Sequence, residues 1–283
     1  MAARRRGALV TPEWVARHRN DPDVKVIEIA GMGQEEMQAY RSGHVPGAVC
    51  WKWKDALWDA YARDFPSPEE FARRCAAAGI GNDMTVVFYG EGVQFGLYAW
   101  WTFRYCGHRN VKVLDGARYR WAAEGRPLVT EVPSPAAAAT YEPVKRNEKM
   151  RIHRDKVLAA LGREGFVILD GRSPEEYKGS RVGGPGGPDV GAVRYGRIPG
   201  AKHLYFEDLL DANKAFRPEA EIRALVESVG AGADHSVITY CRMSHRATVL
   251  YFVLTELLGY RKVRVYDGSW TEWGNLVGVP VER

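Results

Sequence analysis

One cysteine, Cys241, stands in a sequence context that favours chemistry. It follows a β-branched run that ends at Tyr240, and the residues after it are Arg242, Met243, Ser244, His245, Arg246 and Ala247. A tight loop between a strand and a helix exposes backbone N–H groups that lack partners, and these groups and the helix dipole stabilise negative charge. Arg242 and Arg246 add positive charge, so we expect Cys241 to react as a nucleophilic thiolate. The same loop would accept an anionic substrate.

The other three cysteines, Cys50, Cys75 and Cys106, are interpreted as packing residues. No CxxC pair is present, which argues against a disulfide framework and a zinc ribbon and favours a reducing compartment. The seven histidines are scattered, without metal-ligand spacing. We therefore expect no metal and no organic cofactor.

The chain repeats itself at a nearly constant offset. Three segments recur in the same order: 44–48 as 197–201, 85–89 as 236–240, and 111–116 as 263–268. Two copies of one fold explain this order. The copies differ at the candidate nucleophile, because Gly90 stands where the second copy has Cys241.

The elements that must position Cys241 follow from this repeat. Short apolar runs alternate with helical patterns in both copies, which predicts an α/β fold with a parallel-sheet core flanked by helices in each. A segment with three prolines and four consecutive alanines separates the copies. We place the domains at residues 9–127 and 148–283, with a linker at 128–147. In parallel sheets ligands bind beyond the carboxyl ends of the strands, which is where Cys241 lies.

Several of these segments together resemble the rhodanese superfamily, and in particular bacterial two-domain thiosulfate sulfurtransferases. The segments are the Cys-Arg-x-x-x-Arg loop at 241–246, the paired Pro-Gly-Ala turns at 46–48 and 199–201, and the stretches 170–177 and 266–274. The resemblance spans residues 10–281 and implies tandem rhodanese-like domains of which only the second keeps the cysteine.

The resemblance also implies a mechanism. Cys241 would attack the outer sulfur of thiosulfate, release sulfite and carry the sulfur as a persulfide until cyanide, a thiol or a protein acceptor takes it. The N–H groups of residues 243–247 would stabilise the persulfide, while Arg242 and Arg246 bind the sulfonate. Arg172, near the end of the first strand of this copy, is a further candidate for substrate binding. Its alternative is an ion pair with Glu175 or Glu176.

Other chemistries remain open at this point. A 3-mercaptopyruvate sulfurtransferase is less favoured, because such loops prefer small uncharged residues where Arg242 and Met243 stand. The related phosphatases have a loop one residue longer. A persulfide carrier that docks other proteins is the alternative outside the enzymes.

Three features depart from the family pattern. Ser244 replaces a usual glycine, so it is either strained at positive φ or an additional hydroxyl donor. His245 either faces solvent or raises the local positive charge. The glycine-rich insertion at 181–197 is a flexible surface loop or a mobile basic flap.

Composition sets the remaining limits. The 283 residues carry a net charge of +5, with 46% hydrophobic and 27% charged residues, which is typical of a globular protein. This charge is too weak to argue for nucleic acid. The basic run Arg4–Arg6 is interpreted as a solvated tail with no apolar segment after it, and no stretch is long enough to span a membrane. We expect a cytoplasmic protein.

Overall fold

The computed structural model describes residues 7–31 and 37–283. The basic run Arg4–Arg6 lies outside these residues. The chain divides into two compact units. One unit ends at Asn147 and also takes in Ala212–Phe216, and the other comprises Glu148–Asp211 and Arg217–Arg283.

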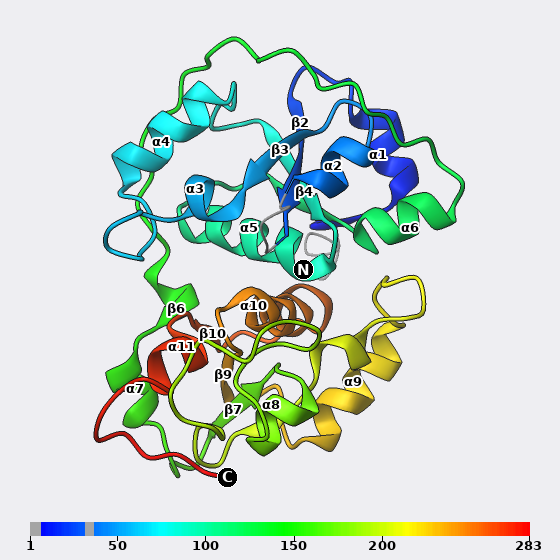
Figure 1. Cartoon of the computed structure of the whole chain (residues 1–283). Coiled ribbons are helices and arrows are strands. Elements are labelled where there is room, and N and C mark those ends of the chain that lie inside the picture. The colour runs from blue at the N-terminus through cyan, green and yellow to red at the C-terminus, as the bar shows by residue number, and fades with distance from the viewer. Residues whose placement is uncertain (1–6, 32–36) are drawn as a thin grey trace. The chain divides into compact units, whose positions relative to one another are not determined.

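The first unit contains one sheet with flanking helices (Figure 1). Its elements are β1 (Leu9–Val10), α1 (Pro12–His18), β2 (Val24–Ala30), α2 (Gln38–Ser42), β3 (Val49–Lys52), α3 (Trp53–Leu57), α4 (Pro68–Ala77), β4 (Thr85–Gly90), α5 (Val93–Tyr105), β5 (Val111–Leu114) and α6 (Ala117–Ala123).

The second unit repeats this order, and its edge strand β8 is shorter than the corresponding β3. Its elements are η2 (Glu148–Met150), β6 (Arg151–Ile152), α7 (Arg154–Leu158), β7 (Phe166–Asp170), α8 (Pro174–Lys178), β8 (Lys202–His203), η3 (Phe206–Leu209), α9 (Glu219–Ser228), β9 (Ser236–Tyr240), α10 (His245–Phe252), η4 (Val253–Leu257), β10 (Val263–Tyr266) and α11 (Ser269–Trp273).

The two sheets have the same topology. The strand order is β1-β5-β4-β2-β3 in one and β6-β10-β9-β7-β8 in the other, and every strand pair is parallel. The register is also repeated, because Glu28 pairs with Tyr89 as Asp170 pairs with Tyr240. The predicted α/β fold with a parallel-sheet core in each copy is therefore confirmed.

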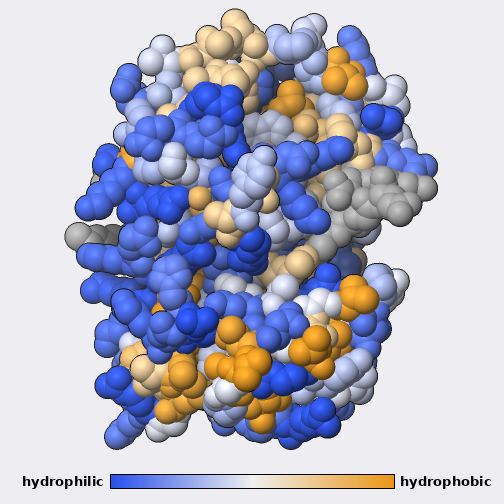
Figure 2. Space-filling view, turned by 60° about the vertical axis from the view of Figure 1, so that its left-hand side comes forward, coloured by the Kyte–Doolittle hydropathy of each residue, from blue (hydrophilic) through white to orange (hydrophobic). Residues whose placement is uncertain are grey.

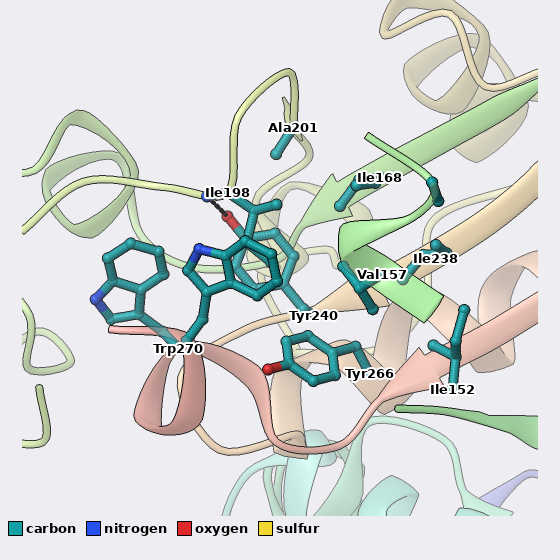
Figure 3. Packing of buried hydrophobic residues seen from close by; sticks show 11 residues of the cluster. Ile152, Val157, Ile168, Ile198, Ala201, Ile238, Tyr240, Tyr266 and Trp270 are labelled. Carbon is teal, nitrogen blue, oxygen red and sulfur yellow. Dashed lines mark hydrogen bonds between the residues drawn. The ribbon is translucent and has the colours of Figure 1, made fainter. Parts of the chain in front are cut away.

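The core of the second unit packs against the strand that leads to Cys241 (Figure 3). Tyr240 is fully buried among Ile198, Ile238, Tyr266 and Trp270. Its hydroxyl accepts the Ile198 N–H at 3.2 Å, which ties the Pro-Gly-Ala turn to the end of β9. This packing fixes where β9 ends and the loop begins.

Helix α8 begins at a capping box. The Ser173 hydroxyl accepts the Glu176 N–H, the Glu176 carboxylate accepts the Ser173 N–H, and Pro174 occupies the first turn. Glu176 is fully buried at this position. The cap therefore places a carboxylate inside the second unit, beside the loop described below.

The face shown in Figure 2 is mostly hydrophilic, with hydrophobic residues in small groups. Among residues 7–31 and 37–283, no helix combines the length and apolar character needed to cross a membrane.

Candidate active site

Cys241 is the first residue after β9, which lies between β10 and β7 in its sheet. Ser244 caps α10, so the loop from strand to helix contains only Cys241, Arg242, Met243 and Ser244. Cys241 is 1% exposed, whereas Arg242 and Met243 are partly exposed. The structure thus brings together the loop residues that the sequence predicted, at the carboxyl end of a parallel sheet.

Helix α11 holds the carbonyl side of this loop. Trp270 donates its N–H to the Cys241 carbonyl at 2.9 Å, and Thr271 donates its N–H and its hydroxyl to the Arg242 carbonyl at 3.0 and 2.6 Å. In a trans peptide the N–H points away from the C=O, so these bonds turn the Arg242 and Met243 N–H groups to the opposite side. The loop is therefore oriented by its carbonyls.

The amide side of the loop remains available. Within the described part of the chain, the N–H groups of Arg242, Met243, Ser244, Arg246 and Ala247 have no hydrogen-bond partner. The last of these belong to the first turn of α10, whose N–H groups have no intrahelical acceptor. A row of such donors beside one cysteine is suited to an anion.

Ser244 adopts φ +71°, the backbone conformation that a glycine would take without strain. Its hydroxyl donates to the Asp267 carbonyl and carboxylate at 2.8 and 3.0 Å. It is thus turned toward Asp267, which is also paired with Arg151 at 3.0 Å. The expectation of a positive φ at Ser244 is therefore confirmed. Its hydroxyl donates its proton to Asp267, within the fold.

His245 is 3% exposed, so the expectation of a solvent-facing histidine is wrong. Its Nδ1 lies 3.0 Å from the Met243 carbonyl oxygen. The first turn of α10 packs this ring inward together with the buried Ala247 and Thr248. His245 therefore belongs to the packed base of the loop.

Arg246 is held by the capping residue of α8. Its two terminal nitrogens bind the two Glu176 oxygens at 2.5 and 2.8 Å in a bidentate pair. Burial lowers the pKa of Arg246, but the Glu176 hydrogen bonds and the charges of Cys241 and Glu176 outweigh it, so this pKa is raised. Arg246 therefore stays charged within electrostatic reach of Cys241, with its terminal nitrogens directed to Glu176.

Arg172 is fully buried at the end of β7. It pairs with Asp170 at 2.7 Å, not with Glu175 or Glu176 as the alternative expectation had it. Its guanidinium also lies over the Trp270 ring, 4.6 Å from the centroid, and donates to the Gly196 carbonyl at 2.8 Å. This geometry makes Arg172 a support for the segments around the loop.

Asp170 completes this buried group. Tyr240 donates its hydroxyl to the Asp170 carboxylate at 2.5 Å, next to the ion pair with Arg172. Burial raises the pKa of Asp170, but the charge and hydrogen bonds of Arg172 and the bond from Tyr240 lower it further, so the net shift is downward. Asp170 is thus a buried carboxylate that joins β7 to β9.

Arg242 is bordered by the glycine-rich insertion. A Cβ built at Gly191 would lie 3.8 Å from the Cδ and Nε atoms of Arg242. Asn275 fastens this part of the insertion through bonds to the Gly191 carbonyl and the Val193 N–H at 3.1 and 3.0 Å. The insertion therefore runs beside the loop.

The arginines of the insertion bind partners within the same unit, either inside the insertion or outside it. Arg194 donates to the carbonyls of Trp273 and Val279, and Arg181 to that of Gly187. Arg197 pairs with Glu282. Arg194 and Arg197 therefore fasten the insertion to its surroundings and Arg181 fastens it internally, while its mobility as a flexible surface loop or a basic flap stays a prediction.

The first unit lacks room for the same chemistry. A Cβ at Gly90 would lie 2.8 Å from the Phe95 Cβ and 2.9 Å from the Ile29 carbonyl oxygen. Real Cβ atoms do not approach so closely, so this position requires glycine. Phe95 also replaces the second loop arginine there.

The other three cysteines lie in surroundings that can be described one by one. Burial and then the charge of Glu28 raise the pKa of Cys50 to about 12, and burial also raises the pKa of Cys75. Cys106 is 2% exposed. These environments fit packing residues. In the described segments, no group of three or more His, Cys, Asp or Glu side chains is arranged to hold a metal ion.

Sequence reasoning missed the residues that position the loop. They are Asp170, Glu176, Ser269, Trp270 and Thr271. All but Asp170 and Glu176 lie in α11, whose sequence was used only as a family motif. A comparison of the two copies could have found one of them, because Ser269 matches Ala117 in the copy without the cysteine.

Comparison with known proteins agrees with this fold. The model of the rhodanese-like domain matches residues 11–124 and 153–276. The sulfur carrier protein TtuD of Thermus thermophilus is 44% identical over 279 residues, covering 97% of this chain and 96% of the relative. A protein of Saccharopolyspora erythraea named "Putative thiosulfate sulfurtransferase" is 39% identical over 280 residues, covering 99% and 97%.

Solved structures share the same architecture. The crystal structure of YnjE matches with a TM-score of 0.83 and 25% identity, covering 98% of this chain and 69% of that one. An anaerobic ergothioneine biosynthesis enzyme from Chlorobium limicola matches with a TM-score of 0.83 and 24% identity, covering 98% and 70%, and this likeness concerns the fold. Since the family model matches both halves and the relatives align over nearly the whole length, the chain belongs to the rhodanese family, as a protein with two rhodanese-like domains.

Proposed function

We propose that the protein is a thiosulfate sulfurtransferase that carries sulfur as a persulfide on Cys241. The family and the names of its relatives support sulfurtransferase activity. The observation that carries the more specific proposal is the row of partnerless N–H groups beside Cys241. Such a row suits a reaction in which the cysteine bears a negative charge before and after it takes up sulfur.

The proposed reaction has two steps. The Cys241 thiolate attacks the outer sulfur of thiosulfate, the bond between the two thiosulfate sulfurs breaks, and sulfite leaves with the electron pair. The product is an anionic persulfide. A nucleophilic acceptor, cyanide or a thiol, then bonds to the terminal sulfur, the S–S bond to Cys241 breaks, and the thiolate is restored.

The loop residues divide these tasks. The N–H groups of residues 242–247 that lack partners stabilise the thiolate and persulfide. Arg242, which is partly exposed, binds the sulfonate end of the donor. Arg246 contributes positive charge from its fixed place on Glu176, and Met243, Ser244, His245 and Ala247 shape the loop. Arg172 supports the loop through Trp270, whose ring it contacts and whose N–H binds the Cys241 carbonyl.

Mass spectrometry of the intact protein after thiosulfate treatment tests the proposal. We expect a gain of one sulfur atom on wild type, located on Cys241, and no gain on Cys241→Ser. Cys75→Ser is the matched control, since it removes a buried thiol of the first unit and should leave the gain unchanged. Wild type that takes up no sulfur on Cys241 would defeat the proposal.

A persulfide carrier is the second candidate, because the 44% identical relative is named a sulfur carrier protein. Steady-state turnover separates the two functions. An enzyme loaded on Cys241 should release sulfur rapidly to cyanide or a small thiol, whereas a carrier should stay loaded until a protein acceptor is added. Replacing thiosulfate with 3-mercaptopyruvate in the same assay tests the alternative donor.

A further inference from the structure

The catalytic copy carries one hydroxyl beside the nucleophile that the other copy lacks. The Ser269 Oγ accepts the N–H of Cys241 at 3.2 Å and donates to the Tyr266 carbonyl at 2.9 Å. Both groups are buried, and Ser269 itself has no exposed surface. The hydroxyl therefore joins the end of β10 to the first residue of the loop.

The direction of these bonds is fixed by the chemistry of a hydroxyl. Ser269 has one O–H proton, which the Tyr266 carbonyl takes, so the oxygen's lone pairs are left for the Cys241 N–H. The next residue, Trp270, binds the Cys241 carbonyl at 2.9 Å. Adjacent residues of α11 thus hold the two polar backbone groups of the nucleophile.

The duplicated fold supplies an internal control. The position equivalent to Ser269 is Ala117, and both residues adopt positive φ, +52° and +50°. The two residues therefore share a positive φ with and without the hydroxyl, although the glycine before each differs, with φ +73° at Gly116 and −55° at Gly268. The hydroxyl is present where the facing residue is Cys241 and absent where it is Gly90.

We propose that Ser269 is a positioning residue for sulfur transfer, which fixes the backbone of Cys241 so that its sulfur faces the loop donors. This inference rests on the proposed function of Cys241. Because Ser269 acts on the nucleophile and not on the donor, its loss lowers kcat and leaves the thiosulfate KM unchanged. The fall is about tenfold, since a buried hydrogen bond contributes roughly the free energy of one tenfold step in rate.

The test compares Ser269→Ala with Ser228→Ala. Alanine is compatible with the backbone, as Ala117 shows. The Ser228 hydroxyl also donates to a carbonyl, that of Leu225 at 2.8 Å, but on the exposed surface of α9. We expect a fall in kcat at constant KM for Ser269→Ala only, whereas a residue that merely stabilises the fold would lower the melting temperature and leave kcat per folded molecule unchanged. Unchanged kcat in Ser269→Ala would overturn the proposal.

Hydrogen exchange at the Cys241 amide gives a second readout that needs no activity. We expect slow exchange in wild type and faster exchange in Ser269→Ala, with Ser228→Ala like wild type. Should Ser269→Ala fail to fold, rapid exchange of this amide in wild type would overturn the proposal, and slow exchange would support it. A protein with a protected amide but no sulfur on Cys241 would refute the proposed function and leave the Ser269 bond standing.

Discussion

Arg242 and Arg246 look equivalent in the sequence but occupy different environments. Glu176 binds both terminal nitrogens of Arg246, whereas Arg242 is partly exposed beside the insertion. The ion pair could not be foreseen, because Glu176 lies 70 residues from Arg246 in the chain and reads as a helix-capping residue. The sequence predicted Cys241 as the nucleophile and the backbone N–H groups beside it. The structure shows that Arg242 and Arg246 differ in their surroundings.

This difference predicts the effect of Arg242→Ala. Removing a charged hydrogen-bond donor should raise the thiosulfate KM about tenfold or more, because such bonds contribute ~1.5–3 kcal/mol, while kcat changes little. Arg264→Ala is the matched control, since it removes an exposed arginine from β10 and the same amount of charge. Steady-state kinetics at fixed ionic strength measures both variants, and an unaltered KM in Arg242→Ala would contradict the assigned role.

At the scale of elements, the strand, loop and helix around Cys241 were predictable from hydrophobic pattern and repeat. The support from neighbouring elements was not, because it depends on side chains that meet only after folding. Helix α11 binds the loop carbonyls, α8 supplies Glu176, and the end of β7 supplies Asp170, which pairs with Arg172 in the segment that follows. Local sequence patterns predict individual helices and strands, whereas the contacts between neighbouring elements depend on how those elements pack.

The buried pair of Asp170 and Arg172 at the end of β7 predicts a pH dependence of stability. The pKa of Asp170 is lowered in the fold, so its contribution is complete above the ordinary aspartate value of 3.8 and is lost as the pH falls through the depressed value. At pH 7, Asp170→Asn should cost ~3–5 kcal/mol, because it leaves Arg172 buried without its counter-ion. The difference from wild type should narrow as the pH falls below 3.8.

Urea unfolding at a series of pH values measures this difference. Asp234→Asn is the control, since that side chain is 90% exposed and should have little effect at any pH. A gap between wild type and Asp170→Asn that stays constant down to the acid limit of folding would show that the ion pair does not carry the effect.

At the scale of the whole molecule, the duplication could be predicted from the sequence because three segments recur in order at a nearly constant offset. Both copies use a buried carboxylate beside a tyrosine and an arginine, but they build the group differently. In the first unit Glu28 pairs with Arg118, which stands at the position of Trp270 in the second. The pKa of Glu28 is raised, mainly by burial, whereas that of Asp170 is lowered. Equal topology therefore does not imply equal electrostatics.

This asymmetry predicts that one chain holds one sulfur and that a cysteine at residue 90 will not create a second site. In Gly90→Cys the new Cβ meets Phe95 and Ile29, so we expect a loss of ~1–3 kcal/mol in stability from overpacking. The double variant Gly90→Cys/Cys241→Ser should gain no sulfur from thiosulfate, since the loop that follows residue 90 also lacks both arginines.

Gly81→Ala is the control for stability, because its Cβ meets only the Thr140 carbonyl oxygen at 3.4 Å. Mass spectrometry and thermal unfolding of the variants measure both effects, and a persulfide on residue 90 would mean that the topology alone suffices to activate a cysteine.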